Sequence, residues 1–144
     1  MIFDGKKFAE EIIANLPKKR VKLAIFLSED NVSGARYVKI KTEVAKRLGV
    51  EIVMNRIDGD EDGIMVQLPH PNSKELISQI PPEKDVDGLR NDSLFLPAAV
   101  SAVQKVLTSP LIPLLSLGEG NERGEVVIVG SKGFVGEKLM QVFP

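Results

Sequence analysis

Hydrophobic and polar positions alternate along the first half of the chain in a way that predicts strands and helices in turn. Apolar residues recur at helical spacing over residues 4–16 and 33–48, whereas 21–27 is a mostly apolar run typical of a strand with both faces covered. Residues 51–54 and 63–68 are two further short apolar segments. Strands separated by a helix predict a parallel sheet with helices packed on it, the three-layer α/β class.

Proline and glycine mark the ends of these segments. Pro17 ends the first helix, while Ser33 is the predicted N-cap of the second helix and Gly49 its predicted C-terminal stop. A third helix over 73–80 stops at two consecutive prolines.

The second half of the chain carries a less regular pattern. A short strand leading into a turn is predicted over 84–88, and an amphipathic helix over 98–107. Residues 109–123 contain prolines, glycines and polar residues and are interpreted as a long connection. Beyond it, the prediction is a strand at 126–129, a glycine-rich turn at 130–136 and a helix starting at residue 137.

One lysine of the 33–48 helix lies on the wrong face. At about 100° per residue, Lys41 falls within an arc of roughly 120° together with the apolar residues of the helix, which are Tyr37, Val38, Val44, Ala45 and Leu48. A buried ammonium needs a partner or loses its proton, and a lysine that readily gives up its proton can serve as an acid or base.

An alternative interpretation of Lys41 is that its stem packs on apolar surface while the amine reaches water. Tyr37 argues against it, because residues four apart on a helix are neighbours. An aromatic ring and an amine would then project together, as in a pocket that stacks a planar ligand.

Composition narrows the classes of protein. The chain has 144 residues, 43% of them hydrophobic and 27% charged, which suits a single compact domain. The net charge of −1 does not favour binding to nucleic acid or to a membrane surface. There is no cysteine, no apolar run long enough to span a bilayer and no signal-peptide pattern, so the expected location is the cytoplasm.

Four segments, in order, resemble the bifunctional methylenetetrahydrofolate dehydrogenase/cyclohydrolases. The segments are Tyr37-Val38-Lys39-Ile40-Lys41, Gly63-Ile64-Met65-Val66-Gln67-Leu68-Pro69-His70-Pro71, Pro82-Glu83-Lys84-Asp85-Val86-Asp87-Gly88, and Val127-Ile128-Val129-Gly130 through Val135-Gly136. Phe3-Asp4-Gly5-Lys6-Lys7-Phe8-Ala9 also resembles the opening of that family, so the likeness extends over nearly the whole chain.

The resemblance implies roles for four residues. It makes Lys41 the catalytic proton-transfer group, Gln67 the residue that hydrogen-bonds this lysine, Asp87 the carboxylate that holds the pterin ring nitrogens, and Tyr37 the ring that stacks on the folate. Taken alone, Gln67 could simply be a polar residue ending a strand, and Asp87 could be a turn-forming Asp before Gly88. Carboxyl ends of parallel strands are where ligands bind in open α/β sheets, which favours convergence of these side chains.

The chain departs from the family pattern at several places. The helix that the family carries between Gly49 and Gly63 is missing, as is a segment after Gly88, and the proline-cysteine-threonine-proline segment of the family is altered at Pro97. His70 stands where a leucine is usual. It is interpreted as a surface residue, with a ligand contact that responds to pH as the alternative.

The predicted cofactor segment is also altered. Where the family has glycine-arginine-serine, this chain has Gly130, Ser131 and Lys132, so the arginine associated with cofactor phosphate is absent. Backbone N–H groups of this turn, which also contains Gly136, can still face a phosphate. A dinucleotide site needs further βα units, so residues 1–120 are predicted to form the folate-substrate domain and 121–144 an incomplete start of a Rossmann-like NAD(P)-binding unit.

The leading hypothesis is therefore an enzyme of one-carbon folate metabolism. It would oxidise methylene-tetrahydrofolate with NADP or NAD and hydrolyse the methenyl product to formyl-tetrahydrofolate. Two alternatives stay open: a cyclohydrolase or non-catalytic folate-binding module without the dehydrogenase, and a structural or dimerising α/β domain. A homodimer is suggested by the resemblance, and no metal site, nucleic acid or membrane partner is predicted.

Overall fold

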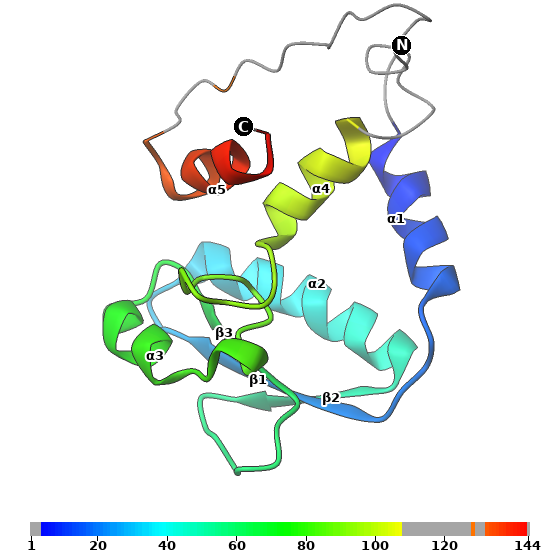
Figure 1. Cartoon of the computed structure of the whole chain (residues 1–144). Helices are drawn as coiled ribbons and strands as arrows, with labels where there is room; N and C mark the ends of the chain where they lie inside the picture. The colour runs from blue at the N-terminus through cyan, green and yellow to red at the C-terminus, as the bar shows by residue number, and fades with distance from the viewer. Residues whose placement is uncertain (1–3, 108–127, 129–131, 144) are drawn as a thin grey trace, which may run out of the picture.

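A computed structural model describes residues 4–107, 128 and 132–143 of the chain (Figure 1). Its three strands form one parallel sheet in the order β2-β1-β3, and helices cover both faces, which confirms the predicted α/β class. In chain order the elements are α1 (Gly5–Asn15), β1 (Val21–Leu27), α2 (Val32–Leu48), β2 (Val50–Met54), β3 (Gly63–Gln67), α3 (Ser73–Gln79), the 3-10 helix η1 (Pro82–Lys84), α4 (Ala98–Leu107) and α5 (Phe134–Val142).

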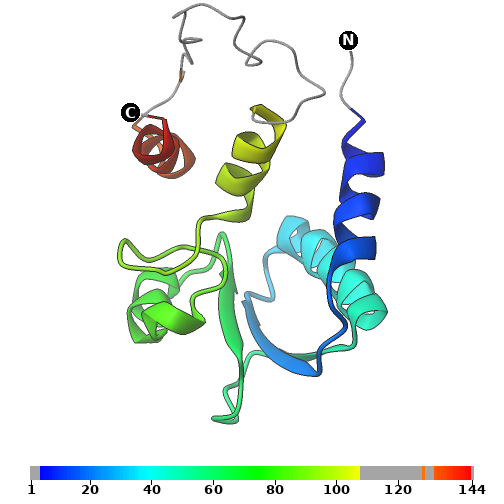
Figure 2. The same ribbon diagram turned by 45° about the vertical axis from the view of Figure 1, so that its right-hand side comes forward.

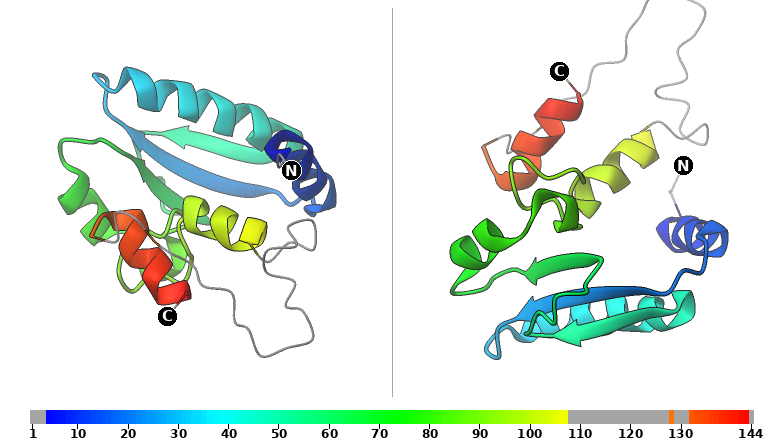
Figure 3. Two further views of the ribbon diagram at one scale, coloured as in Figure 1. Left: turned by 90° about the horizontal axis from the view of Figure 1, so that it is seen from above. Right: turned by 60° about the horizontal axis from the view of Figure 1, so that its bottom comes forward.

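The side chains of the central strand β1 divide the core between the two faces of the sheet. Ala24 packs with Ile64 and Val66 toward α3, whereas its neighbour Ile25 packs with Val38 of α2 and with Met65. Side chains of a strand alternate between faces, so each strand contributes to both halves of the core. Figures 2 and 3 show α2 on one side of the sheet and α3, α4 and α5 on the other.

Local capping explains where α2 begins and ends. Its N-cap is Asn31, whose side-chain oxygen accepts the Gly34 N–H at 2.7 Å, so the prediction of Ser33 as N-cap was wrong. Ser33 instead donates its hydroxyl to the same Asn31 oxygen. Gly49 ends the helix as predicted, with φ of 76° in the left-handed region that glycine adopts without strain.

A loop over residues 55–62 connects β2 to β3 without a helix, as the sequence predicted. β2 ends beside Ile25 of β1, and β3 begins on the other side of β1 beside Leu23. The loop therefore crosses β1 and returns by only two residues along it. That short path explains how a connection of this length replaces the usual crossover helix between parallel strands.

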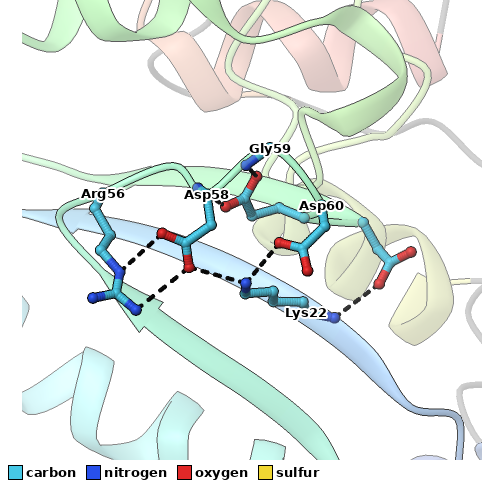
Figure 4. Close-up of polar contacts among 7 residues, drawn as sticks. Lys22, Arg56, Asp58, Gly59 and Asp60 are labelled. Atoms are coloured by element: carbon cyan, nitrogen blue, oxygen red, sulfur yellow. Dashed lines mark hydrogen bonds and ion pairs between the residues drawn. The ribbon is translucent and has the colours of Figure 1, made fainter.

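Charged groups hold this loop on β1 (Figure 4). The Lys22 ammonium lies 2.9 Å from Asp58 and 2.6 Å from Asp60. Glu61 is 2% exposed, and its carboxylate accepts the backbone N–H groups of Asp58 and Gly59. Ligand atoms of these three acidic residues lie within 4.8 Å of one another, and the Lys22 ammonium is bound to two of them.

The segment around residues 84–88 differs from its prediction. It is not a strand: η1 ends at its first residue, Lys84, and its backbone pairs with the sheet only at a single bridge between Asp85 and Ile64, while Val86 packs its side chain on the core. The prolines before the segment suit the first turn of η1, and the N–H groups of Lys84, Asp85, Val86 and Gly88 donate to nearby carbonyls of the turn rather than to a neighbouring strand.

The C-terminal elements agree with prediction in part. α4 has its predicted bounds, and α5 packs against it, but α5 begins at Phe134, so Gly136 is helical rather than part of a turn. The connection predicted at 109–123 and the strand predicted at 126–129, apart from Ile128, lie outside the described residues.

Among the described helices, none combines the length and the apolar content that crossing a bilayer requires.

Candidate active site

Lys41 lies on the face of α2 that covers the sheet, as the helical pattern predicted. Its side chain is half-buried, and the ammonium donates to the Gln67 side-chain oxygen at 3.1 Å and contacts the Met65 sulfur at 3.6 Å. The amine is thus held by β3, contrary to the alternative in which it simply extends into water.

Gln67 is in place because of the two-residue period of β3. Met65 and Gln67 are two apart and therefore point to the same face, the one that α2 covers. The Gln67 side-chain nitrogen donates to the Leu68 carbonyl at 3.2 Å, which leaves its oxygen turned toward Lys41. Both the strand-ending role and the lysine contact of Gln67 are therefore present.

Asp87 belongs to the same site through its electrostatics. Burial raises the pKa of its carboxyl above the ordinary value of 3.8, the positive charge of Lys41 lowers it, and the neighbouring Asp85 raises it. Asp85 is fully buried: one of its oxygens accepts the Arg90 N–H at 2.7 Å and the other has no hydrogen-bond partner. The charge of Lys41 thus acts on the partly buried Asp87 carboxyl, and an amine and a carboxyl coupled in this way are suited to moving protons and binding N–H donors.

Tyr37 and His70 lie at the margin of the site. Tyr37 is 61% exposed, so its predicted place on the buried face was wrong: it stands one turn before Lys41 at the edge of that face. His70 is half-buried, and its Nδ1 accepts the Asn72 N–H at 3.2 Å. That contact assigns it a role in the turn that follows β3.

The predicted cofactor residues are described in part. Gly130 and Ser131 lie outside the described residues. Lys132 is exposed, and Gly136 is buried inside α5. No side chain caps the first turn of α5, whose N-cap is Gly133, so the N–H groups at this helix end are not occupied by a capping side chain.

Sequence reasoning missed three residues that build the site. Met65 contacts Lys41 through its sulfur. The charge of Asp85 raises the pKa of Asp87. Asn31 hydrogen-bonds the turn after β3 and so joins it to α2. Strand alternation from Gln67 was a signal for Met65. Asp85 is buried and bonded to Arg90, whereas Asp87 is only partly buried, and the sequence pattern did not reveal this difference.

Comparison with curated proteins gives consistent relatives over nearly the whole chain. The chain is 30% identical to the bifunctional protein FolD of Rickettsia bellii, 31% to that of Mycoplasmopsis synoviae and 32% to that of Helicobacter hepaticus. These alignments include 96 to 98% of this chain and 60 to 63% of each relative. The chain thus spans about three fifths of the length of the curated relatives that it matches. None of the protein-family models matches it.

The alignments also bear on the missing segments. The alignment to the Rickettsia bellii protein runs over 178 positions, whereas this chain has 144 residues, so at least 34 of those positions (178 less 144) are gaps in this chain. The relative therefore has residues, within the aligned region, that this chain lacks.

Solved structures share the fold. The Trypanosoma brucei methylenetetrahydrofolate dehydrogenase-cyclohydrolase, solved with NADP and an inhibitor, superposes with a TM-score of 0.69 at 20% identity, over 98% of this chain and 61% of that protein. A silkworm methylenetetrahydrofolate dehydrogenase gives a TM-score of 0.55 at 23% identity, over 76% of this chain and 48% of its own.

Proposed function

Since this chain belongs to the family of the bifunctional FolD proteins, we propose that it acts in one-carbon folate metabolism on methylene- and methenyl-tetrahydrofolate. The observation that carries the proposal is the hydrogen bond of Lys41 to Gln67 at 3.1 Å, together with the partly buried Asp87, whose pKa the charge of Lys41 lowers against the larger effect of burial. These are a proton-transfer group, its hydrogen-bond partner and an acceptor for the ring nitrogens of a pterin, brought together from α2, β3 and the segment after η1.

In the proposed cyclohydrolase step, Lys41 moves the protons. Water adds to the carbon between the two folate nitrogens, its proton passes to the Lys41 amine, and the lysine then protonates the nitrogen that leaves as the ring opens. The Gln67 oxygen accepts a hydrogen bond from the amine and keeps it aimed at this carbon. Asp87 accepts hydrogen bonds from the pterin ring, and the exposed ring of Tyr37 provides a face on which the ligand stacks.

The proposed oxidation of methylene-tetrahydrofolate uses NADP or NAD, which supplies the hydride acceptor when bound. The uncapped first turn of α5 fits a cofactor phosphate, and Gly130, Ser131, Lys132 and Gly136 are the residues proposed to lie against it. Residues 1–120 would then form the folate-substrate domain and 121–144 the start of the Rossmann-like unit. A homodimer in the cytoplasm, with no nucleic acid or membrane partner, completes the proposal.

The experiment follows the absorbance of methenyl-tetrahydrofolate mixed with the chain, with and without nicotinamide cofactor. We expect Lys41→Ala to abolish the enzyme-dependent loss of signal while a folate analogue still binds. Lys39→Ala is the matched control, because Lys39 is an exposed lysine of the same helix. Hydrolysis that persists in Lys41→Ala would refute the assignment.

The same samples separate the two alternatives. A cyclohydrolase without dehydrogenase activity would consume methenyl-tetrahydrofolate but produce no reduced cofactor from methylene-tetrahydrofolate. A structural domain would bind no folate, and Lys41→Met would leave its stability unchanged or higher.

A further inference from the structure

We propose that Asn31 is a positioning residue that sets the alignment of Lys41 with Gln67 by joining the start of α2 to the turn after β3. The inference deepens the proposed function and rests on it, because the alignment it explains is that of the proton-transfer group with its partner. Neither the sequence pattern nor the resemblance assigned a role to this residue.

The four hydrogen bonds of the Asn31 side chain point in two directions. Its oxygen accepts the Gly34 N–H at 2.7 Å and the Ser33 hydroxyl at 3.1 Å, both in the first turn of α2. Its nitrogen donates to the Pro69 carbonyl at 2.8 Å, in the turn after β3, and to the carbonyl of Gln67, the last residue of β3, at 3.4 Å. Only 6% of the residue is exposed, so water does not compete for these bonds.

The packing of α2 explains why such a bridge matters. The helix packs mainly on β1 and β2 and reaches β3 through Lys41, whereas Gln67 is the last residue of β3, the strand at the edge of the sheet opposite β2. β1 pairs with β3 as far as Gln67, but packing of α2 on β1 and β2 does not by itself fix the start of the helix relative to that end of β3. The Asn31 amide links the helix directly to Pro69, two residues after the Gln67 that hydrogen-bonds Lys41.

The absence of a side chain at Gly34 leaves room for the Asn31 amide. A Cβ at this position would lie 2.4 to 2.8 Å from the amide atoms of Asn31, closer than real contacts allow. The Asn31 side chain is short and held by four hydrogen bonds, so it has no nearby alternative position that keeps them. An alanine at residue 34 would thus expel the amide while Asn31 itself is unchanged.

Two variants break the bridge in different ways. Asn31→Asp keeps the oxygen that caps α2 but replaces the donor by a second oxygen, which repels the carbonyls of Pro69 and Gln67. Gly34→Ala displaces the amide by volume. Asp4→Ala is the matched control, because Asp4 caps α1 in the same manner, accepting the Lys7 N–H at 3.0 Å far from the site.

The first measurement needs no substrate. Trinitrobenzenesulfonate labels free amines, and peptide mass spectrometry gives its rate at Lys41, with Gln67→Ala as the variant that removes the partner outright. We expect Asn31→Asp and Gly34→Ala to label Lys41 about fivefold faster than the unmodified chain, as Gln67→Ala does, with no change in Asp4→Ala. Labelling of Lys41 at the unmodified rate in both variants, while Gln67→Ala is faster, would overturn the proposal.

The second measurement links the bridge to the reaction. For methenyl-tetrahydrofolate we expect both variants to lower kcat about fivefold with KM nearly unchanged, because the ligand contacts remain and the proton-transfer group is misaligned. An equal loss in Asp4→Ala would assign the effect to capping in general and overturn the positioning role. If the unmodified chain hydrolyses no methenyl-tetrahydrofolate, the proposed function fails, and the labelling rates still decide the role of Asn31.

Discussion

Asp87 is partly buried, and the charge of its carboxyl depends on burial, on Lys41 and on Asp85. Burial favours the neutral form of Asp87, and the adjacent Asp85 favours it further, while the Lys41 ammonium favours the ionised form. Burial is the largest of the three causes, so the pKa of Asp87 is raised overall. A carboxylate in this condition is a stronger hydrogen-bond acceptor for a ligand than one in bulk water, and it costs the free protein stability when it is ionised.

The raised pKa of Asp87 gives a prediction about stability. Between the ordinary value of 3.8 and the higher pKa in the folded chain, the folded state holds a proton that the unfolded state has released. The contribution of Asp87 to stability is therefore present below 3.8 and lost as pH rises through the folded value. We expect Asp87→Asn to raise the free energy of unfolding near neutral pH, with a difference that shrinks as the pH falls toward 3.8.

Urea unfolding of both proteins across this pH range measures the difference. Glu83→Gln, at an exposed position of η1, controls for the general effect of removing a negative charge. A gap between Asp87→Asn and the unmodified chain that grows toward low pH would contradict the expected sign.

Single residues differed in how far the sequence predicted them. Lys41 was found because a charge at an apolar position breaks the helical pattern, and Gln67 and Asp87 came from the resemblance. Asn31 was missed because two candidate caps, Asn31 and Ser33, stand two residues apart. The choice between them depends on the carbonyl of Pro69, which is distant in sequence and supplies the partner for the Asn31 amide.

At the scale of elements, the loop over 55–62 takes the place of a crossover helix between β2 and β3. Ion pairs and hydrogen bonds hold it on β1, where a helix would be held by apolar packing. Hydrogen bonds to the Lys22 ammonium hold the pKa values of Asp58 and Asp60 below their usual range. Hydrogen bonds from backbone N–H groups, most strongly that of Asp58, lower the pKa of the buried Glu61. The loop thus depends on ionised carboxylates, which an apolar helix packed on the sheet would not.

This dependence predicts an acid-sensitive loop. Stability from Asp58 and Asp60 is present above their ordinary pKa of 3.8 and lost as pH falls through their depressed values in the folded chain. We expect Lys22→Gln to lower the urea midpoint near neutral pH and to flatten its decline below pH 3.8. Lys18→Gln, at an exposed position, should follow the unmodified chain; parallel declines for Lys22→Gln and the unmodified chain would refute the role of the ion pairs.

Element boundaries followed the sequence wherever one local signal decided them. β1 and α4 have their predicted bounds, and Gly49 ends α2, because apolar periodicity and glycine geometry are properties of the segment itself. The strand predicted at 84–88 was wrong: its apolar and acidic alternation resembles a strand, but its N–H groups donate to nearby carbonyls of a turn. Its single bridge to Ile64 could not be read from periodicity, because it depends on where β3 lies.

For the molecule as a whole, α5 brings the predicted cofactor unit into contact with the loop that follows Asp87. Lys138 of α5 is 7% exposed, and its ammonium donates to the Arg90 carbonyl at 3.0 Å. Arg90 in turn donates its N–H to Asp85 and its guanidinium to Asp92. A chain of hydrogen bonds thus runs from α5 to the buried neighbour of the proposed pterin-binding carboxylate.

Lys138→Met tests whether this contact holds α5 in place. Methionine keeps a flexible apolar stem and removes the ammonium, so packing is largely retained while one charged hydrogen bond is lost. We expect amide hydrogen exchange in α5 to become about tenfold faster, with β1 and α2 unchanged, as the loss of such a bond predicts for local opening. Lys132→Met is the matched control, because Lys132 is exposed at the turn before α5. If exchange in α5 stays at the unmodified rate, packing on α4 alone holds the helix, and the hydrogen bonds from Lys138 through Arg90 do not couple α5 to Asp85. Faster exchange that also reaches residues 85–90 would show that they do.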